Sequence, residues 1–168
     1  MESSIWNIQL GDLIPASELC KQIELECQPE LLALCSRIES YFTQHTVTEI
    51  DDRHVELVFM LFGKMVDELT HLFLKEKGLI YPGILAKGLQ FVLQPAVIQQ
   101  IQLTQEKITA LLNRLRQLLN NFQMKPTWSA EWKNCVQDFF QVEVKIHQWI
   151  YVEQNLLYPH FIHSTNVN

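Results

Sequence analysis

Apolar residues recur at spacings of three and four along four long stretches of this chain, the spacing of one face of an α-helix. The stretches cover residues 15–42, 52–80, 95–122 and 129–158. No segment shows the strict alternation of a β-strand. The pattern therefore predicts an all-α, up-down-up-down four-helix bundle with short polar connections. We expect residues 1–168 to form a single domain, with tails at 1–14 and 160–168.

Two prolines bear on where these helices end. Pro29 lies inside the first stretch, where a proline usually kinks a helix at a cost of about 3 kcal/mol. The apolar phase continues through it, so we expect one long kinked helix. Pro82 disfavours helical geometry in the residue before it, so the second helix is expected to end near Tyr81.

Three polar residues interrupt the apolar stripes: Glu76, Gln105 and Glu153, each from a different predicted helix. Facing helices of a bundle carry such positions into its core. A charged side chain is almost never fully buried unless it is paired or binds a metal. Something must therefore neutralise the two carboxylates. Lys21 or Glu24 can join them from the margin of the first stripe.

Each glutamate opens the same short motif. Residues 76–82 read Glu-Lys-Gly-Leu-Ile-Tyr-Pro and residues 153–159 read Glu-Gln-Asn-Leu-Leu-Tyr-Pro, so both follow Glu-x-x-Leu-(Ile/Leu)-Tyr-Pro. In both copies the glutamate also falls on the apolar stripe of its helix, and we expect the stripe to continue to Leu79 in the first copy and to Leu156 in the second. The repeat and the helical phase together place the two glutamates at the centre of the predicted site.

With these motifs the chain resembles the hemerythrin-like, or HHE cation-binding, proteins. It is most similar to the branch that repairs iron–sulfur centres after nitrosative or oxidative damage. The family segments Lys-Glu-Glu-x-x-Leu-Phe-Pro, Glu-Asn-x-x-Leu-Phe-Pro and Leu-Pro-Glu-Leu-Ile resemble residues 75–82, 153–159 and 28–32. The resemblance spans nearly the whole chain. It implies a four-helix bundle that holds two irons, with His-x-x-x-Glu on the second and fourth helices and one histidine on each of the others.

The residues that this resemblance would assign to iron are mostly replaced. The bridging glutamates of the family correspond to Glu76 and Glu153. The four histidine positions of the family fall on Lys21, Leu72, Gln105 and Trp149. Leucine and tryptophan cannot ligate a metal, and a tryptophan fills the space that two ions and a bridging oxygen would need. The substitutions predict that the di-iron centre has been lost.

The histidines of the chain do not restore these positions by a shift in register. His71 precedes Leu72 by one residue, which is about 100° around a helix. His147 precedes Trp149 by two residues, so it also points away from its stripe. We expect both histidines to be ordinary, partly exposed residues.

Three interpretations of the glutamates stay open. Without a metal, one carboxyl is protonated with a raised pKa, or the ammonium of Lys21 lies between the two carboxylates and Gln105 adds a hydrogen bond. With a metal, Glu76, Glu153, Gln105 and Glu24 are candidate oxygen ligands. In the third interpretation the glutamates reach past their neighbours to solvent.

Charge and composition indicate which classes of binding partner and which cellular compartment to expect. The formal net charge of −6 argues against binding to nucleic acid or to an anionic membrane. The first residues lack the basic region and apolar run of a signal peptide, and no stretch is apolar enough to span a membrane, so we expect a soluble cytoplasmic protein. Four cysteines without a CxxC pair suggest buried reduced thiols rather than a zinc or redox site.

No nucleophile–base pair, phosphate-binding glycine loop or redox cysteine pair is present, which disfavours a conventional enzyme. The first functional hypothesis is a degenerate hemerythrin-like protein without a cofactor. It would act as a noncatalytic interaction or regulatory module for a protein partner or as a homodimer. The second is an iron- or manganese-binding protein of the nitrosative or oxidative stress response or of iron–sulfur repair. The Phe59 side of the second helix and the turn from Trp128 to Trp132 are candidate partner surfaces, and both could equally be core.

Overall fold

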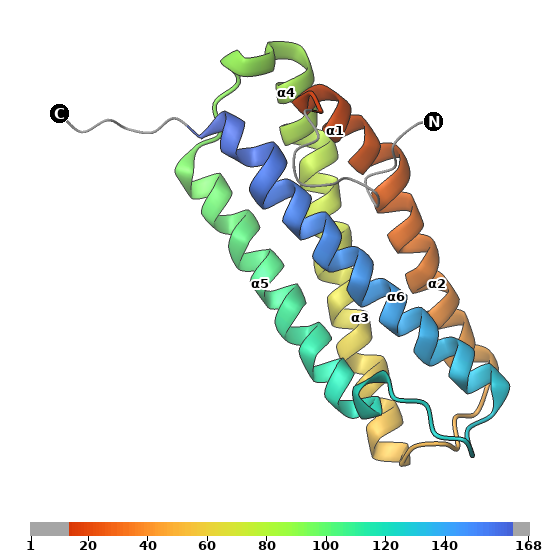
Figure 1. Cartoon of the computed structure of the whole chain (residues 1–168). Coiled ribbons are helices and arrows are strands. Elements are labelled where there is room, and N and C mark those ends of the chain that lie inside the picture. The colour runs from red at the N-terminus through yellow and green to blue at the C-terminus, as the bar shows by residue number, and fades with distance from the viewer. Residues whose placement is uncertain (1–13, 163–168) are drawn as a thin grey trace.

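In the computed structural model, which describes residues 14–162, the chain is all-helical, with no strand in that range. Four long helical rods lie side by side along the length of the molecule (Figure 1). Along residues 14–162 no helix is both long enough and apolar enough to cross a membrane.

Three of the four rods contain a π-helical turn. The first rod consists of α1 (Ala16–Gln22), a π turn (Ile23–Cys27) and α2 (Gln28–Gln44). The second consists of α3 (Asp52–Lys75), a π turn (Glu76–Ile80) and α4 (Tyr81–Lys87), followed by the 3₁₀ turn Gly88–Gln90. The third is α5 (Pro95–Leu118), followed by the 3₁₀ turn Asn120–Phe122. The fourth consists of α6 (Ala130–Val152), a π turn (Glu153–Leu157) and the 3₁₀ turn Tyr158–Phe161.

Local signals in the sequence fix several helix ends. The side chain of Asp51 caps α3 by accepting a hydrogen bond from the backbone N–H of Arg53 at 2.8 Å, and Ser129 caps α6 in the same way. Pro95 occupies the first turn of α5, where its missing N–H is not needed. Gly88 follows α4 with a positive φ of 54°, a conformation that favours glycine.

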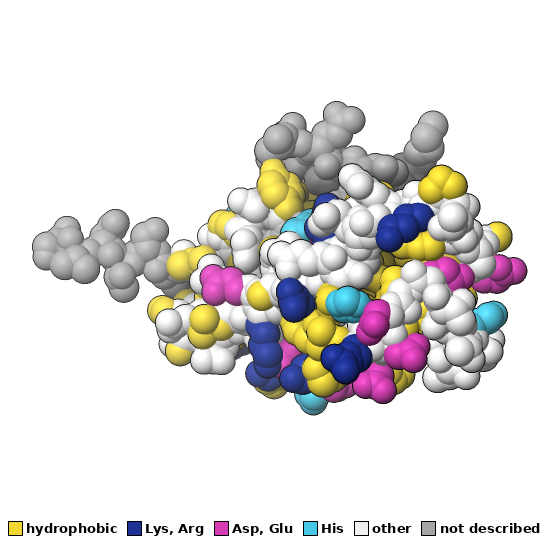
Figure 2. All heavy atoms as spheres, turned by 90° about the horizontal axis from the view of Figure 1, so that it is seen from below, with side chains coloured by type: hydrophobic (Ala, Val, Ile, Leu, Met, Phe, Trp, Pro, Cys, Tyr) yellow, Lys and Arg dark blue, Asp and Glu magenta, His cyan; other side chains and the backbone are white. Residues whose placement is uncertain are grey.

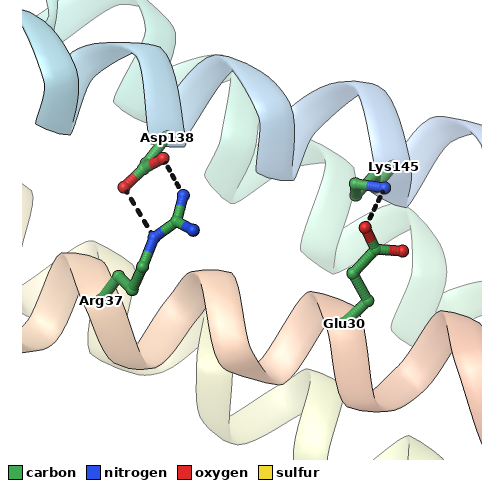
Figure 3. A network of polar contacts seen from close by, with 4 residues as sticks. All are labelled: Glu30, Arg37, Asp138 and Lys145. Carbon is green, nitrogen blue, oxygen red and sulfur yellow. Dashed lines mark hydrogen bonds and ion pairs between the residues drawn. The ribbon is translucent and has the colours of Figure 1, made fainter.

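The rods pack in pairs around one apolar core, with α3 along α5 and α2 along α6. Phe62 of α3 meets Phe139 of α6 edge to face, with ring centroids 5.1 Å apart. Ion pairs bridge the outer side of the α2–α6 contact: Arg37 with Asp138, and Lys145 with Glu30 at 2.9 Å (Figure 3). In each pair one partner is exposed to solvent, so the pairs add little free energy and the buried apolar stripes hold the rods together.

The connections α2–α3 and α5–α6 lie at the same end of the molecule (Figure 1). Viewed from that end, acidic, basic and apolar side chains are interspersed, and no single type covers the face (Figure 2). Trp128 and Trp132, which could form either a partner surface or part of the core, are 5% and 0% exposed and belong to the core. Phe59 is 45% exposed, so that expected surface is accessible.

Pro82 does not end the second rod, so the prediction that this helix ends near Tyr81 is wrong. The π turn before it bonds the N–H of Tyr81 to the carbonyl of Glu76, five residues back instead of four. Pro82 then falls in the first turn of α4, a position that tolerates proline, and the rod continues to Lys87. Pro29 is accommodated in the same way, so the first rod is continuous as predicted.

The π turns also change which residues face the core. Each adds one residue to its turn, which rotates the following side chains by about 100°. Leu79, expected on the apolar stripe, is 74% exposed, and Ile80 is buried in its place. Likewise Leu157 is fully buried where Leu156 was expected.

A tail was expected from residue 160, but the packed part of the fourth rod continues to Phe161. Phe161 is 2% exposed, and its carbonyl accepts a hydrogen bond from the backbone N–H of Leu93 at 2.9 Å. The rest of that tail, from residue 163, and residues 1–13 of the expected N-terminal tail lie outside the described residues.

Candidate functional site

Glu76 and Glu153 are brought together in the interior of the molecule, and both are 0% exposed. Each is the first residue of a π turn: Glu76 directly follows α3, and Glu153 directly follows α6. The interpretation in which these glutamates reach solvent is therefore wrong. Their charge has to be balanced inside the protein.

Two side chains from other rods, those of Gln28 and Tyr158, donate hydrogen bonds to Glu76, and the hydroxyl of Tyr81 lies close to it. Its Oε1 accepts a hydrogen bond from the hydroxyl of Tyr158 at 2.9 Å. Its Oε2 accepts from Nε2 of Gln28 at 2.8 Å and lies 3.1 Å from the hydroxyl oxygen of Tyr81. Both oxygens of this carboxyl group are thus occupied by protein groups.

Glu153 is held in a similar way. Its Oε1 accepts a hydrogen bond from the hydroxyl of Tyr81 at 2.8 Å, and its Oε2 accepts from Nε2 of Gln105 at 2.8 Å. The amide oxygen of Gln105 in turn accepts from Nε2 of Gln154 at 2.7 Å, which fixes the orientation of the Gln105 amide. Gln105 therefore presents its N–H, not its oxygen, to the carboxylate.

Tyr81 touches both carboxyl groups but has only one hydroxyl proton. Its shorter contact is to Glu153, so that proton goes to Glu153 Oε1. The contact between Tyr81 and Glu76 then needs a proton from Glu76 itself. This count places the additional proton of the pair on Glu76.

The electrostatics agree with this proton count. Burial, followed by the charge of Glu153 and a hydrogen bond to it, raises the pKa of Glu76 well above its usual range. Burial also raises the pKa of Glu153 to about 7, opposed by hydrogen bonds that include those from Glu76, Tyr81 and Tyr158. The pair therefore holds at least one proton near neutral pH, most stably on Glu76.

Two of the residues that the resemblance assigns to iron-ligand positions, Leu72 and Trp149, pack as core residues. Leu72 is 2% exposed and Trp149 is fully buried, edge to face with Phe73 at a centroid distance of 5.1 Å. The indole N–H of Trp149 lowers the pKa of Glu153, although Nε1 makes no hydrogen bond of ordinary geometry. Within residues 14–162 no group of three or more His, Cys, Asp or Glu side chains is placed to hold a metal. These residues do not fit a di-iron centre.

The two candidates from the first rod stay outside the site. Lys21 is exposed and forms no ion pair with any described residue, so the hypothesis that its ammonium lies between the two carboxylates is wrong. Glu24 is only partly buried and does not join the pair. Both lie in or beside the part of the rod where the π turn Ile23–Cys27 resets the helical phase. His71 and His147 are exposed, as predicted.

Sequence reasoning missed three members of the site: Gln28, Tyr81 and Tyr158. All three are buried, and each directly follows a π turn. Each also directly precedes a proline, and that shared position is the signal in the sequence that identifies them.

Two cysteines lie near the carboxyl pair. Cys20 and Cys27 are free and buried, and their thiols interact electrostatically with Glu153 and Glu76. Burial first, then these charges, raises the pKa of Cys20 to about 12 and raises that of Cys27 as well. Both thiols stay protonated at neutral pH, so neither is an activated nucleophile or a ready metal ligand.

No protein-family model matches the sequence, and no curated protein matches it either. The resemblance to hemerythrin-like proteins thus stays a prediction that depends on the motifs around Glu76, Glu153 and Gln28.

Proposed function

We propose that this chain is a hemerythrin-like, up-down-up-down four-helix bundle that has replaced the di-iron centre by a hydrogen-bonded carboxyl pair. In this proposal it is a cytoplasmic, noncatalytic interaction or regulatory module. Its accessible side of α3 around Phe59 is the candidate surface for a protein partner or a second copy.

The observation that supports this proposal is the way the two carboxyl groups are satisfied. Each of the four rods contributes one donor: Gln28, Tyr81, Gln105 and Tyr158. These N–H and O–H groups occupy the lone pairs that a metal would need. A shared proton balances one negative charge, which is the task of the metal in the family that the chain resembles.

A noncatalytic role fits the same geometry. Glu76 and Glu153 are completely buried, so a substrate could reach them only if the rods separated. The neighbouring thiols are held protonated by their surroundings. The centre is therefore better suited to holding the four rods in register than to turning over a substrate.

One observation favours a second candidate, an iron- or manganese-binding protein of the stress response or of iron–sulfur repair. The amide oxygen of Gln28 is buried beside Glu76 and has no hydrogen-bond partner. Two carboxylates and one amide oxygen are hard ligands of the kind that a single manganese ion or ferrous ion accepts. Such an ion would displace the shared proton and the donors from the tyrosines.

Elemental analysis separates the two candidates. The full chain is expressed with added iron and with added manganese, purified without chelator, and compared with the variants Glu76→Gln and Glu143→Gln. Glu143 is a second buried glutamate, paired with Arg116 and remote from the site, so its variant is a matched control. We expect far less than one metal per chain in all three proteins. A stoichiometric metal in the wild type and in Glu143→Gln that is lost in Glu76→Gln would overturn the proposal.

A further inference from the structure

A cavity of about 530 Å³ lies between α3, α5 and the connection that precedes α5. Its volume falls within the range of about 300–1,000 Å³ that is typical of small-molecule sites. Its floor is apolar and buried, and consists of Leu72, Ile80, Leu93 and Ile101. Exposed apolar side chains continue this lining to the surface at Leu79, Val92 and Val97.

Specific features of the backbone build the walls of this cavity. The π turn Glu76–Ile80 rotates Leu79 out of the core, which gives the second rod an apolar wall where a regular helix would bury that side chain. The opposite wall is tied to the fourth rod, because the N–H of Leu93 donates to the carbonyl of Phe161 at 2.9 Å. Phe91 packs on the ring of Phe161 at a centroid distance of 6.0 Å.

The α3 side of the cavity carries basic groups. His71 and Lys75 are both exposed and both line it. Nδ1 of His71 donates to the carbonyl of Asp67 at 2.8 Å, so Nε2 of the neutral ring is an acceptor and Lys75 is the donor available to an anion. Lys75 forms no ion pair with a described residue, and the acidic lining residue Glu68 is already paired with Lys107. The unbalanced charge at the cavity is therefore positive.

From this combination we propose that the cavity binds a small amphipathic anion, an unbranched alkyl carboxylate. The alkyl chain lies on Leu72, Ile80, Leu93 and Ile101, and the carboxylate meets the ammonium of Lys75. The proposal goes beyond the proposed function and does not depend on it, because none of the cavity residues donates to the carboxyl pair.

Calorimetric titration of the full chain with alkyl carboxylates, kept below their micellar concentrations, tests this site. We expect affinity to rise from hexanoate to octanoate to decanoate by about fourfold for each methylene, until the apolar floor is covered. Decylammonium, with the same chain and the opposite charge, is expected to bind at least about tenfold more weakly than decanoate. No heat with decanoate, or equal binding of decylammonium, would overturn the proposal.

Matched variants on the second rod locate the site. Lys75→Gln is expected to weaken decanoate binding by about tenfold, and Leu79→Gln by about fourfold or more. Lys64→Gln and Leu74→Gln change the same residue types at exposed positions of α3 outside the cavity, and should leave the affinity unchanged. All four side chains are exposed, so the variants are expected to fold. Equal effects at the cavity and control positions would place the binding elsewhere and contradict the proposal.

Discussion

Glu76 and Glu153 have the same motif and the same burial, yet their surroundings give them different roles. Glu153 accepts two hydrogen bonds from groups whose donor atoms are fixed, the amide of Gln105 and the hydroxyl of Tyr81. Glu76 shares the hydroxyl of Tyr81 only at a longer distance and needs its own proton there. At the scale of single residues, Glu76 therefore acts as the neutral acid and Glu153 as the carboxylate.

This asymmetry predicts different costs for two chemically identical substitutions. In Glu76→Gln the new amide N–H faces Nε2 of Gln28, but the Gln28 amide can turn over and accept with its unpartnered oxygen, so the cost should be small. Glu153→Gln sets an amide N–H against donors that point at it, and we expect it to lower the free energy of unfolding by about 1–3 kcal/mol more than Glu76→Gln. Urea denaturation monitored by circular dichroism at neutral pH measures the difference. Equal costs, or a larger cost at Glu76, would contradict the assigned proton position.

At the scale of helical elements, the site depends on a local pattern that occurs three times. Each π turn closes with a backbone bond from the residue just before a proline to a carbonyl five residues earlier. Widening the helix there relieves the clash that a proline makes with the preceding turn. The pre-proline residues Gln28, Tyr81 and Tyr158 are thereby turned to the centre. The first rod has Ile23 where the others have glutamate, so it contributes a donor but no charge.

The same pattern explains what could be predicted from the sequence. Gln105 was found because it lies on a regular helix, and Glu76 and Glu153 were found because each directly follows one, so the period of 3.6 residues still holds there. Within and beyond each π turn that period fails by one residue, which is why Leu79 and Leu156 were misplaced and Tyr81 and Tyr158 were missed. Lys21 was assigned by the family's register, and in the structure that position is exposed. Hydrophobic periodicity carries no information on such insertions.

Alanine substitutions at two glycines of the second rod test how tightly the chain is packed in and after its π turn. Gly78 lies within the turn with open space around the position of a Cβ, so Gly78→Ala should raise the free energy of unfolding by about 0.5–1 kcal/mol through helix propensity. A Cβ on Gly83 of α4 would collide with the ring of Phe91. Gly83→Ala should therefore be less stable than Gly78→Ala by about 1–3 kcal/mol.

Thermal and urea denaturation of both variants provide this comparison, with Gly63→Ala as the control, because Gly63 of α3 also has open space around it. Gly63→Ala and Gly78→Ala should be stabilised alike. If Gly78→Ala lowers stability, the turn has a conformation that disfavours alanine, and the account of the second rod would have to change.

At the scale of the whole molecule, the polar centre can form only when all four rods are assembled, since each supplies one donor. Separation of any one rod would expose an unpaired carboxyl oxygen to a partly dry interior, at a cost of about 1–3 kcal/mol. The centre therefore favours cooperative unfolding, and its protonation is coupled to the folding of the entire chain.

That coupling predicts how stability depends on pH. The pKa values of Glu76 and Glu153 are raised in the folded protein, that of Glu153 from 4.5 to about 7, so the folded state binds more protons than the unfolded state above pH 4.5. The contribution of the pair is fully present below the unfolded pKa and is lost as pH rises through the folded pKa. The free energy of unfolding should therefore fall between pH 4.5 and about 7, and continue to fall above 7 because of Glu76.

Comparing wild type with Glu76→Gln isolates this effect from the other titrating groups. Each proton held only by the folded state contributes a slope of about 1.4 kcal/mol per pH unit. The variant cannot titrate at position 76, so its curve should be flatter by up to that amount from pH 5 to 8. Glu143→Gln, in which the buried glutamate is paired with Arg116, should keep the wild-type slope. Parallel curves for wild type and Glu76→Gln would mean that Glu76 is ionised in the folded protein, and a cation would then have to balance the two carboxylates.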